Sequence, residues 1–464
     1  MAKEKRYNSR ASYRISSDLL RNSEMRYGEF VRYYGRAAEI VIPDTVTTIS
    51  EGAFRGNHRL TRVTLGKHVT VIQANAFRDC VNLRTVDFSA GLRVVGADAF
   101  RDCHELTTAF LPRTVVLIGA GAFRDCHSLA HLTLSSGIEE LGAYAFCECS
   151  ALEEVDLPEH LKTLHRGVFF HCTALRRVGV PEGLGAVGRY AFGRCERLEA
   201  LELPDTVTYL GNGALSECRS IKRFRLPEQV KFVGDYTFAC CESLEEIELP
   251  EELNYVGINA FCACASLREI TLPTPLRRIG ASAFMGCHSL MRITVPAAVS
   301  ELGRRAFAYC TSLEEVELRA DVKAIEDETF MGCRSLSGIY LSDTVERIGE
   351  RAFYRCLALS STRLSKNLKL IEERAFGSCE SLPEISLPSS LMQMENYIFA
   401  DCKALKTVIM PDHRVRVGYS IFTGCDALQL LVVSNAHRMV GYRFDRWDVP
   451  SRTRVILHKQ LIKS

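Results

Sequence analysis

The stretch "GAFRDCHSL" at residues 121–129 decides the fold, because nearly the same words precede it as "DAFRDCHEL" (98–106) and "NAFRDCVNL" (75–83). Its phenylalanine recurs every 23 residues from Phe54 to Phe422 without an insertion or deletion, and Leu215 replaces it once. Self-similarity at a fixed period is the signature of repeat architectures, in which each repeat buries its apolar side against its neighbours. The sequence therefore predicts a solenoid of stacked coils.

Two columns of identical side chains are predicted to run through this stack. One holds the phenylalanines, and the other holds the cysteine that follows the phenylalanine by three residues, which accounts for 16 of the 19 cysteines. The expected ladder begins with Phe77, Phe100, Phe123 and Phe146 and with Cys80, Cys103, Cys126 and Cys149.

The cysteine column indicates a structural role in packing and not a metal site or a catalytic site. Equivalent residues repeat along one line and point the same way, whereas zinc needs four ligands that converge tetrahedrally. Equivalent parallel positions also rarely supply the Cβ geometry of a disulfide. We therefore predict buried thiols that act as small hydrophobes, with no metal and no cofactor. For Cys147, Cys240 and Cys262, which lie outside the column, adventitious oxidation is more plausible than a designed bridge.

Each coil has a short strand near its start, as the copy "CESLEEIELPEELNYVGINAFCA" (241–263) illustrates. Its "LEEIEL" segment alternates apolar and polar residues, which is typical of a half-buried strand. The proline that follows has no N–H and ends the strand. A glycine near the Ala-Phe pair, such as Gly96, Gly119 or Gly142, suits a turn with an unusual backbone angle.

The complete unit, Leu-x-x-Ile-x-Leu-Pro-x-x-Leu-x-x-Ile-Gly-x-x-Ala-Phe-x-x-Cys, closely resembles the BspA-like, or Treponema-type, leucine-rich repeats. The resemblance covers about residues 30–445. It implies a leucine-rich-repeat solenoid of about 17–18 stacked coils with short parallel β-strands, wound as a right-handed curved superhelix. It also implies protein binding, and it brings no shared active site.

The ends of the chain depart from the repeat. Residues 1–29 lack the period and are basic, so we expect an N-terminal arm and cap, with a nucleic-acid or lipid tether as the alternative. Residues 30–445 form the predicted solenoid, and residues 446–464 form a C-terminal cap or tail. Trp447, the single tryptophan, falls in the cysteine position of the last degenerate coil and is expected to close the core.

Composition argues against several classes of protein. Lys+Arg 58 against Asp+Glu 56 gives a nearly neutral chain, which is unlike a dedicated nucleic-acid binder. No apolar run is long enough to span a bilayer, and the first residues do not form a secretory signal, so we expect a cytoplasmic protein with reduced thiols. No nucleophile elbow, P-loop, zinc-protease motif or dinucleotide fingerprint is present, so no catalytic residue is predicted.

Charged residues flank the strand centres and change sign at nearly every coil from 149 to 271. Opposite charges on neighbouring strands can pair along the sheet face, which would neutralise it and fix its register; a striped docking surface is the alternative. The alternation breaks in residues 291–363, which we predict to be the partner contact. The predicted partner-binding residues are Arg292, Glu314, Glu315, Glu317, Tyr340, Arg363 and Phe110. Ile409, Leu430 and Val432 are further candidates.

These observations predict a non-enzymatic scaffold that binds a partner protein through the sheet face. Two alternatives stay open: a cell-surface adhesin of the same fold, exported by a non-classical route, and a metal- or thiol-based enzyme built on the cysteine column. Neither the identity of the partner nor the oligomeric state follows from the sequence.

Overall fold

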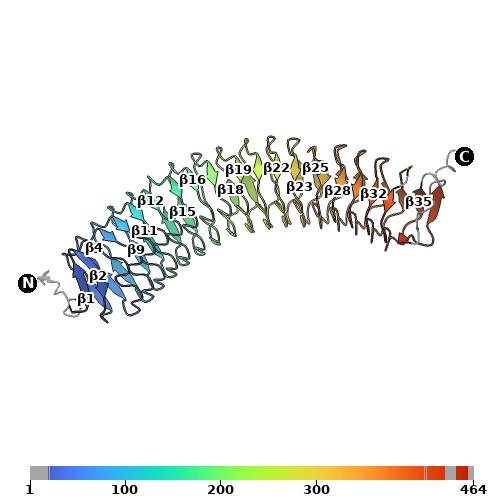
Figure 1. Ribbon diagram of the computed structural model, residues 1–464. Helices are drawn as coiled ribbons and strands as arrows, with labels where there is room; N and C mark the ends of the chain where they lie inside the picture. Colours follow the sequence, from blue (N-terminus) through green and yellow to red (C-terminus); the bar gives the residue numbers. More distant parts are fainter. Residues whose placement is uncertain (1–18, 20, 412, 414, 434–445, 458–464) are drawn as a thin grey trace, which may run out of the picture. The chain divides into compact units, whose positions relative to one another are not determined.

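The computed structural model describes residues 19, 21–411, 413, 415–433 and 446–457 (Figure 1). The chain divides into two compact units, Met1–Gly183 and Leu184–Ser464, which we call unit 1 and unit 2. In each unit, short strands from successive coils lie side by side and form two rows (Figure 1). Of the basic residues of the predicted N-terminal arm, Arg21 and Arg26 lie within the described residues, and the others lie outside them.

The first row of each unit, which we call the sheet face, contains the strand that follows the cysteine. In unit 1 its strands are β3 (Glu39–Val41), β5 (Arg62–Thr64), β7 (Thr85–Asp87), β9 (Thr108–Phe110), β11 (His131–Thr133), β13 (Glu154–Asp156) and β15 (Arg177–Gly179). In unit 2 they are β18 (Arg223–Arg225), β20 (Glu246–Glu248), β23 (Arg292–Val295), β25 (Glu315–Leu318), β27 (Gly338–Tyr340), β29 (Ser361–Arg363), β31 (Glu384–Ser386), β33 (Thr407–Ile409), β35 (Leu430–Val433) and β36 (Arg454–Leu457).

The second row contains mostly two-residue strands that precede the phenylalanine. In unit 1 they are β1 (Ser23–Arg26), β2 (Glu29–Tyr33), β4 (Thr48–Ile49), β6 (Val71–Ile72), β8 (Val94–Val95), β10 (Leu117–Ile118), β12 (Glu140–Leu141) and β14 (Thr163–Leu164). In unit 2 they are β16 (Ala186–Val187), β17 (Tyr209–Leu210), β19 (Phe232–Val233), β21 (Tyr255–Val256), β22 (Arg278–Ile279), β24 (Glu301–Leu302), β26 (Ala324–Ile325), β28 (Arg347–Ile348), β30 (Leu370–Ile371), β32 (Gln393–Met394) and β34 (Arg416–Val417).

The strands are parallel and pair one repeat apart, as the period predicts. Glu154 on β13 lies opposite Arg177 on β15, and Arg223 on β18 lies opposite Glu246 on β20. At the N-terminal end β1 pairs antiparallel with β2, whose other edge pairs parallel with β4. This hairpin covers the edge of β2, so that β1 is the first strand of the second row in unit 1.

The phenylalanines stack in a column in each unit, interrupted in unit 2 by Leu215. Ring centroids of Phe77 and Phe100 lie 5.0 Å apart, and those of Phe123 and Phe146 lie 5.4 Å apart. All four side chains are fully buried. Offset aromatic stacking contributes about 0.5–1.5 kcal/mol per pair beyond the area buried, so the column stabilises each coil through both neighbours.

The cysteine column is buried as predicted, and its thiols also have polar partners. Cys80 Sγ donates to the carbonyl of Phe54 at 3.1 Å, and Cys126 Sγ donates to that of Phe100 at 3.2 Å. Burial raises the pKa of Cys80 to about 12, so the thiol stays protonated and remains a donor. Cysteine suits the position because it is small and apolar and still offers a weak S–H to a buried carbonyl. The sequence pattern revealed the burial but not this bond.

The repeat glycines have a different purpose from the one predicted. Gly96, Gly119 and Gly142 do not have positive φ angles. A Cβ atom on Gly119 would instead lie 2.5 Å from the backbone nitrogen of Ala97 in the preceding coil. The left-handed backbone occurs next to the phenylalanine, for example at Asp98 (φ 51°) and Asp102 (φ 60°). The repeat glycine is therefore required for close approach between coils.

At the C-terminal end Trp447 is buried, with 2% of its surface exposed. Its carbonyl accepts the N–H of Phe422 at 2.9 Å. In the coil before, the same bond runs from Phe399 to Ile421, which precedes the next phenylalanine. Trp447 thus occupies the position before the phenylalanine and not the predicted cysteine position, because the register slips after Phe422.

Candidate protein-binding face

The sheet face presents two outward side chains per strand, because successive residues of a strand point to opposite sides. On β18, Phe224 is buried while Arg223 and Arg225 are exposed. On β20, Ile247 is buried between two exposed glutamates. Outward side chains at the same repeat position therefore lie above one another on neighbouring strands and form a column. The charge of each column depends on which residues occupy that position in successive coils.

A shallow groove of about 750 Å³ lies on the sheet face of unit 2. Its walls come from residues 200–203, β18, β20 and residues 269–271. The charged side chains that line it are Glu202, Arg223, Arg225, Glu246, Glu248 and Glu269. Four acidic groups thus stand against two basic ones.

The two arginines differ in how far they neutralise this groove. Arg223 Nε lies 3.3 Å from a carboxylate oxygen of Glu246 on the neighbouring strand. Arg225 donates instead to Asp205 at 2.9 Å, in the turn beyond the strand, and also lies 3.8 Å from Glu228. Its guanidinium is therefore held toward the turn and away from the column between Glu202 and Glu248.

The remaining acidic groups of the groove carry uncompensated charge. The side chains of Glu202, Glu248 and Glu269 make no ion pair or hydrogen bond with any residue that the structure describes, and all three are exposed. Buried apolar residues, among them Leu203 and Ile270, form the floor beneath them. This combination of an apolar floor and free carboxylates matches an extended segment with basic side chains.

The predicted pairing of opposite charges is present at several other places on the sheet face. In unit 1, Arg177 lies 3.2 Å from Glu154 and 2.9 Å from Asp156. Arg62 lies 2.9 Å from Asp87. These pairs are exposed and each contributes about 0–1 kcal/mol, so their main effect is to neutralise the face.

The residues predicted from the break in charge alternation lie on β23, β25, β27 and β29, except Glu314, which directly precedes β25. Arg292 lies 3.6 Å from Glu315, while Tyr340 is 64% exposed and is paired in register with Arg363. Phe110 is 61% exposed but belongs to β9 of unit 1.

The glutamates at and just before β25 have more ion-pair and hydrogen-bond partners than the sequence suggested. Glu317 is bound by Arg319 at 2.8 Å in the same coil, and Thr294 donates to it at 3.1 Å. Arg319 holds the pKa of the Glu317 carboxyl below its usual value. Glu314, just before β25, is exposed, and its side chain makes no ion pair or hydrogen bond with the described residues.

The further apolar candidates near the C-terminal end differ in exposure. Ile409 is 41% exposed, whereas Val432 is buried, on a strand that pairs with β36. Val432 is therefore not available to a partner, and Leu430 is half-buried.

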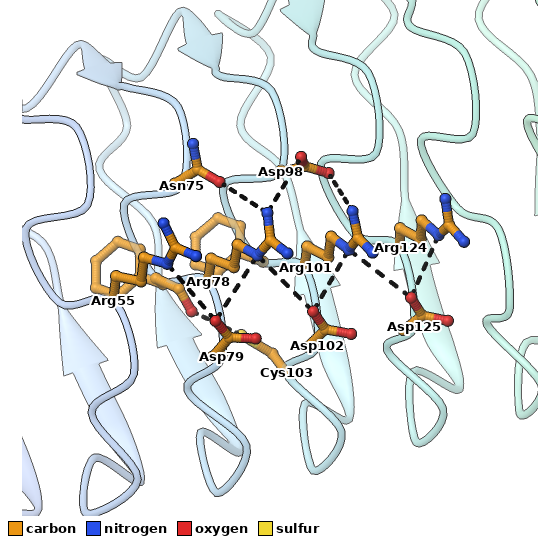
Figure 2. Close-up of polar contacts among 12 residues, drawn as sticks. Arg55, Asn75, Arg78, Asp79, Asp98, Arg101, Asp102, Cys103, Arg124 and Asp125 are labelled. Atoms are coloured by element: carbon orange, nitrogen blue, oxygen red, sulfur yellow. Dashed lines mark hydrogen bonds and ion pairs between the residues drawn. The ribbon is translucent and has the colours of Figure 1, made fainter.

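A row of arginine and aspartate side chains runs beside the phenylalanine column of unit 1 (Figure 2). It consists of Arg55, Arg78, Arg101 and Arg124 with Asp79, Asp102 and Asp125. Arg101 Nε lies 3.4 Å from Asp102 in its own coil and 3.9 Å from Asp125 in the next. Burial and the neighbouring Asp79 carboxyl raise the pKa of Asp102, although Arg101 opposes this. The arginines and aspartates of this row link neighbouring coils, and their opposite charges offset each other. The repeated Arg-Asp pair of "AFRDC" was the sequence feature that could have revealed the row.

Histidines and cysteines do not converge into a metal centre in the described part of the chain, where no group of three or more His, Cys, Asp or Glu could hold a metal ion. His104 and His127 stack at 5.1 Å between ring centroids, and both are exposed. Within the described residues, no helix has the length and apolar character needed to cross a membrane.

Comparison with known proteins agrees with the repeat and the fold. A family model described as the BspA type leucine rich repeat region matches residues 28–153, 95–200, 185–314 and 301–429. No curated protein matches the chain. A leucine-rich repeat protein from Bacteroides ovatus is 21% identical, with a TM-score of 0.51, over 94% of this chain and 97% of its own.

Two further solved structures are more distant in shape. A leucine rich cell surface protein from Faecalibacterium prausnitzii is 20% identical over 94% of this chain and 98% of its own, with a TM-score of 0.41. A T. pallidum leucine-rich repeat protein is 23% identical over 52% of this chain and 83% of its own, with a TM-score of 0.26. The family match covers most of the sequence, and the chain therefore belongs to the BspA type leucine-rich repeat family.

Proposed function

We propose that this protein is a non-enzymatic scaffold that binds a partner protein through the sheet face of unit 2. The supporting observation is the groove over β18 and β20, where Glu202 and Glu248 keep uncompensated charge because Arg225 is held by Asp205. The partner we propose presents an extended segment with lysine or arginine side chains. Such a segment would neutralise the glutamates and cover the apolar floor in one step.

The surface on β25, β27 and β29 is the second candidate for the same function. Tyr340 is its largest exposed aromatic side chain, and tyrosine is enriched at protein interfaces. Its glutamates are more nearly satisfied than those of the groove, since Arg292 and Arg319 contact two of the three. We therefore rank it second.

Charge reversal separates the two surfaces. Immobilised full-length chain is incubated with an extract of the cells that encode it, and the captured proteins are identified by mass spectrometry. Glu202→Lys with Glu248→Lys is expected to weaken capture of the specific partner at least about tenfold, because like charges would then face each other. Glu314→Lys with Glu315→Lys and Glu317→Lys is expected to leave capture unchanged.

A matched control lies three residues beyond the groove. Glu251 is exposed in the turn after β20, and its side chain has no ion-pair partner among the described residues. Glu251→Lys therefore changes the net charge as much as Glu248→Lys does without entering the groove. Glu248→Lys alone is measured beside it. Equal loss of capture in Glu248→Lys and Glu251→Lys would show a general charge effect and contradict the groove, whereas loss only in the Glu314, Glu315 and Glu317 variant would assign binding to the second surface.

The cytoplasmic location remains a prediction from the sequence. Fractionation of the cells that encode the protein tests it, because exposure of the protein to an externally added protease would contradict it and favour the adhesin alternative.

A further inference from the structure

Three cysteines lie outside the cysteine column, and two of them occupy neighbouring coils. Cys240 is the second residue after Phe238, and Cys262 is the first residue after Phe261. All nineteen cysteines lie in the described part of the chain and are free thiols. Seventeen are buried, and only Cys240 and Cys262 are partly exposed. Cys147, the third outside the column, is 2% exposed.

The backbone holds Cys240 and Cys262 together. The N–H of Cys240 donates to the carbonyl of Cys262 at 2.7 Å. The Cα of Cys240 lies about 1.5 Å from its own nitrogen, and the Cα of Cys262 lies about 2.4 Å from its own carbonyl oxygen. Together with the hydrogen bond, these lengths limit the distance between the two Cα atoms to about 6.6 Å. Disulfides join Cα atoms that are about 4.4–6.8 Å apart, so the backbone already satisfies this requirement.

The column cysteines beside them are engaged differently. Cys241 Sγ donates to the carbonyl of Leu215 at 3.3 Å, and Cys264 Sγ donates to that of Phe238 at 3.1 Å. Both point into the core and are fully buried. A soluble oxidant therefore reaches Cys240 and Cys262 and not these neighbours.

We propose that Cys240 and Cys262 form a reversible disulfide between adjacent coils of unit 2 when the protein meets a peroxide. One thiolate attacks a peroxide oxygen to give a sulfenic acid and release water or an alcohol. The second thiol attacks the sulfenic sulfur, which forms the S–S bond and releases water. In total, two thiols lose two protons and two electrons, and the O–O bond is reduced.

The bond would link two successive coils that both contribute residues to the groove. β20 follows Cys240, and residues 269–271 follow Cys262, and both line the groove. Burial raises the pKa of Cys240, and it raises that of Cys262 to about 11. Since only the thiolate attacks, the reaction is slow at neutral pH and accelerates about tenfold per pH unit up to that pKa.

Peptide mapping tests the proposal on the full-length reduced chain treated with hydrogen peroxide. Trypsin alone leaves residues 232–268 as one peptide, because no lysine or arginine lies between Lys231 and Arg268. Additional cleavage after glutamate separates residues 232–242 from residues 253–268. We expect these two peptides joined, with a mass lower by two hydrogens than their sum, and separated again by dithiothreitol.

Single substitutions show which two cysteines form the disulfide. Cys240→Ser and Cys262→Ser should each abolish the link, while Cys147→Ser should keep it. Both test positions hold polar residues in other coils, such as Asp79 and Arg78, so serine is expected to preserve the fold, which thermal unfolding checks. Separate sulfinic acids or unreacted thiols at the two positions would overturn the proposal, as would a link that persists in Cys262→Ser and therefore uses Cys264.

Discussion

Phe307→Ala is expected to lower the free energy of unfolding of unit 2 by about 3–5 kcal/mol, because it removes a ring from the continuous aromatic column. Phe307 is fully buried, with ring centroids 5.4 Å from Phe284 and 5.6 Å from Phe330. A cavity here would deprive two coils of their stacking partner at once. Urea unfolding of the purified chain measures the loss, and hydrogen exchange around residue 307 locates it.

The natural exception in the column provides the control. Leu215 occupies the phenylalanine position and is fully buried, so the position accepts leucine when its neighbours adapt. We expect Phe307→Leu to cost about 1–2 kcal/mol. If Phe307→Ala unfolded at the same urea concentration as the wild type, the column would not be the source of stability that the structure indicates.

Gly303→Ala is expected to destabilise unit 2 by about 3 kcal/mol, because two backbones approach too closely for a methyl group. The added Cβ would lie 2.4 Å from the nitrogen of Ala281. The backbone cannot easily move away, since the N–H of Gly303 donates to the carbonyl of Ile279 at 2.9 Å. The midpoint of urea unfolding measures the effect.

Gly286→Ala is the matched control in the same unit. Gly286 has a positive φ of 76°, but the nearest atom to an added Cβ is 3.7 Å away. Tyr309 occupies the equivalent position of the next coil at φ 61°, which shows that the position accepts a side chain. We expect a cost of about 1 kcal/mol. Equal losses at Gly286 and Gly303 would argue against close packing as the reason for the repeat glycine.

The sequence predicted the features that depend on repetition. Phe123 and Cys126 recur in fixed positions, so their burial and stacking followed from the period alone. The pairing of Arg177 with Glu154 followed from the same register. These features follow from the repeat position of each residue and need no knowledge of the coordinates of any single side chain.

The sequence did not predict which of several neighbouring groups each long charged side chain binds. Arg225 could pair along the face or with the turn, and only the structure shows that Asp205 binds it. Arg319 similarly satisfies Glu317 from within its own coil. Long side chains select among several partners by small differences in distance, so periodicity did not identify the groove. The glycine was misassigned because a turn and a close approach favour the same residue.

Carboxyl labelling of the complex tests the central claim most directly. The full-length chain, alone and with its captured partner, is treated with a carbodiimide and glycine ethyl ester, and the labelled glutamates are quantified by mass spectrometry. Binding in the groove predicts that labelling of Glu202 and Glu248 falls in the complex while labelling of Glu251 does not change. Unchanged labelling of Glu202 and Glu248, with protection at Glu314 or elsewhere, would contradict it.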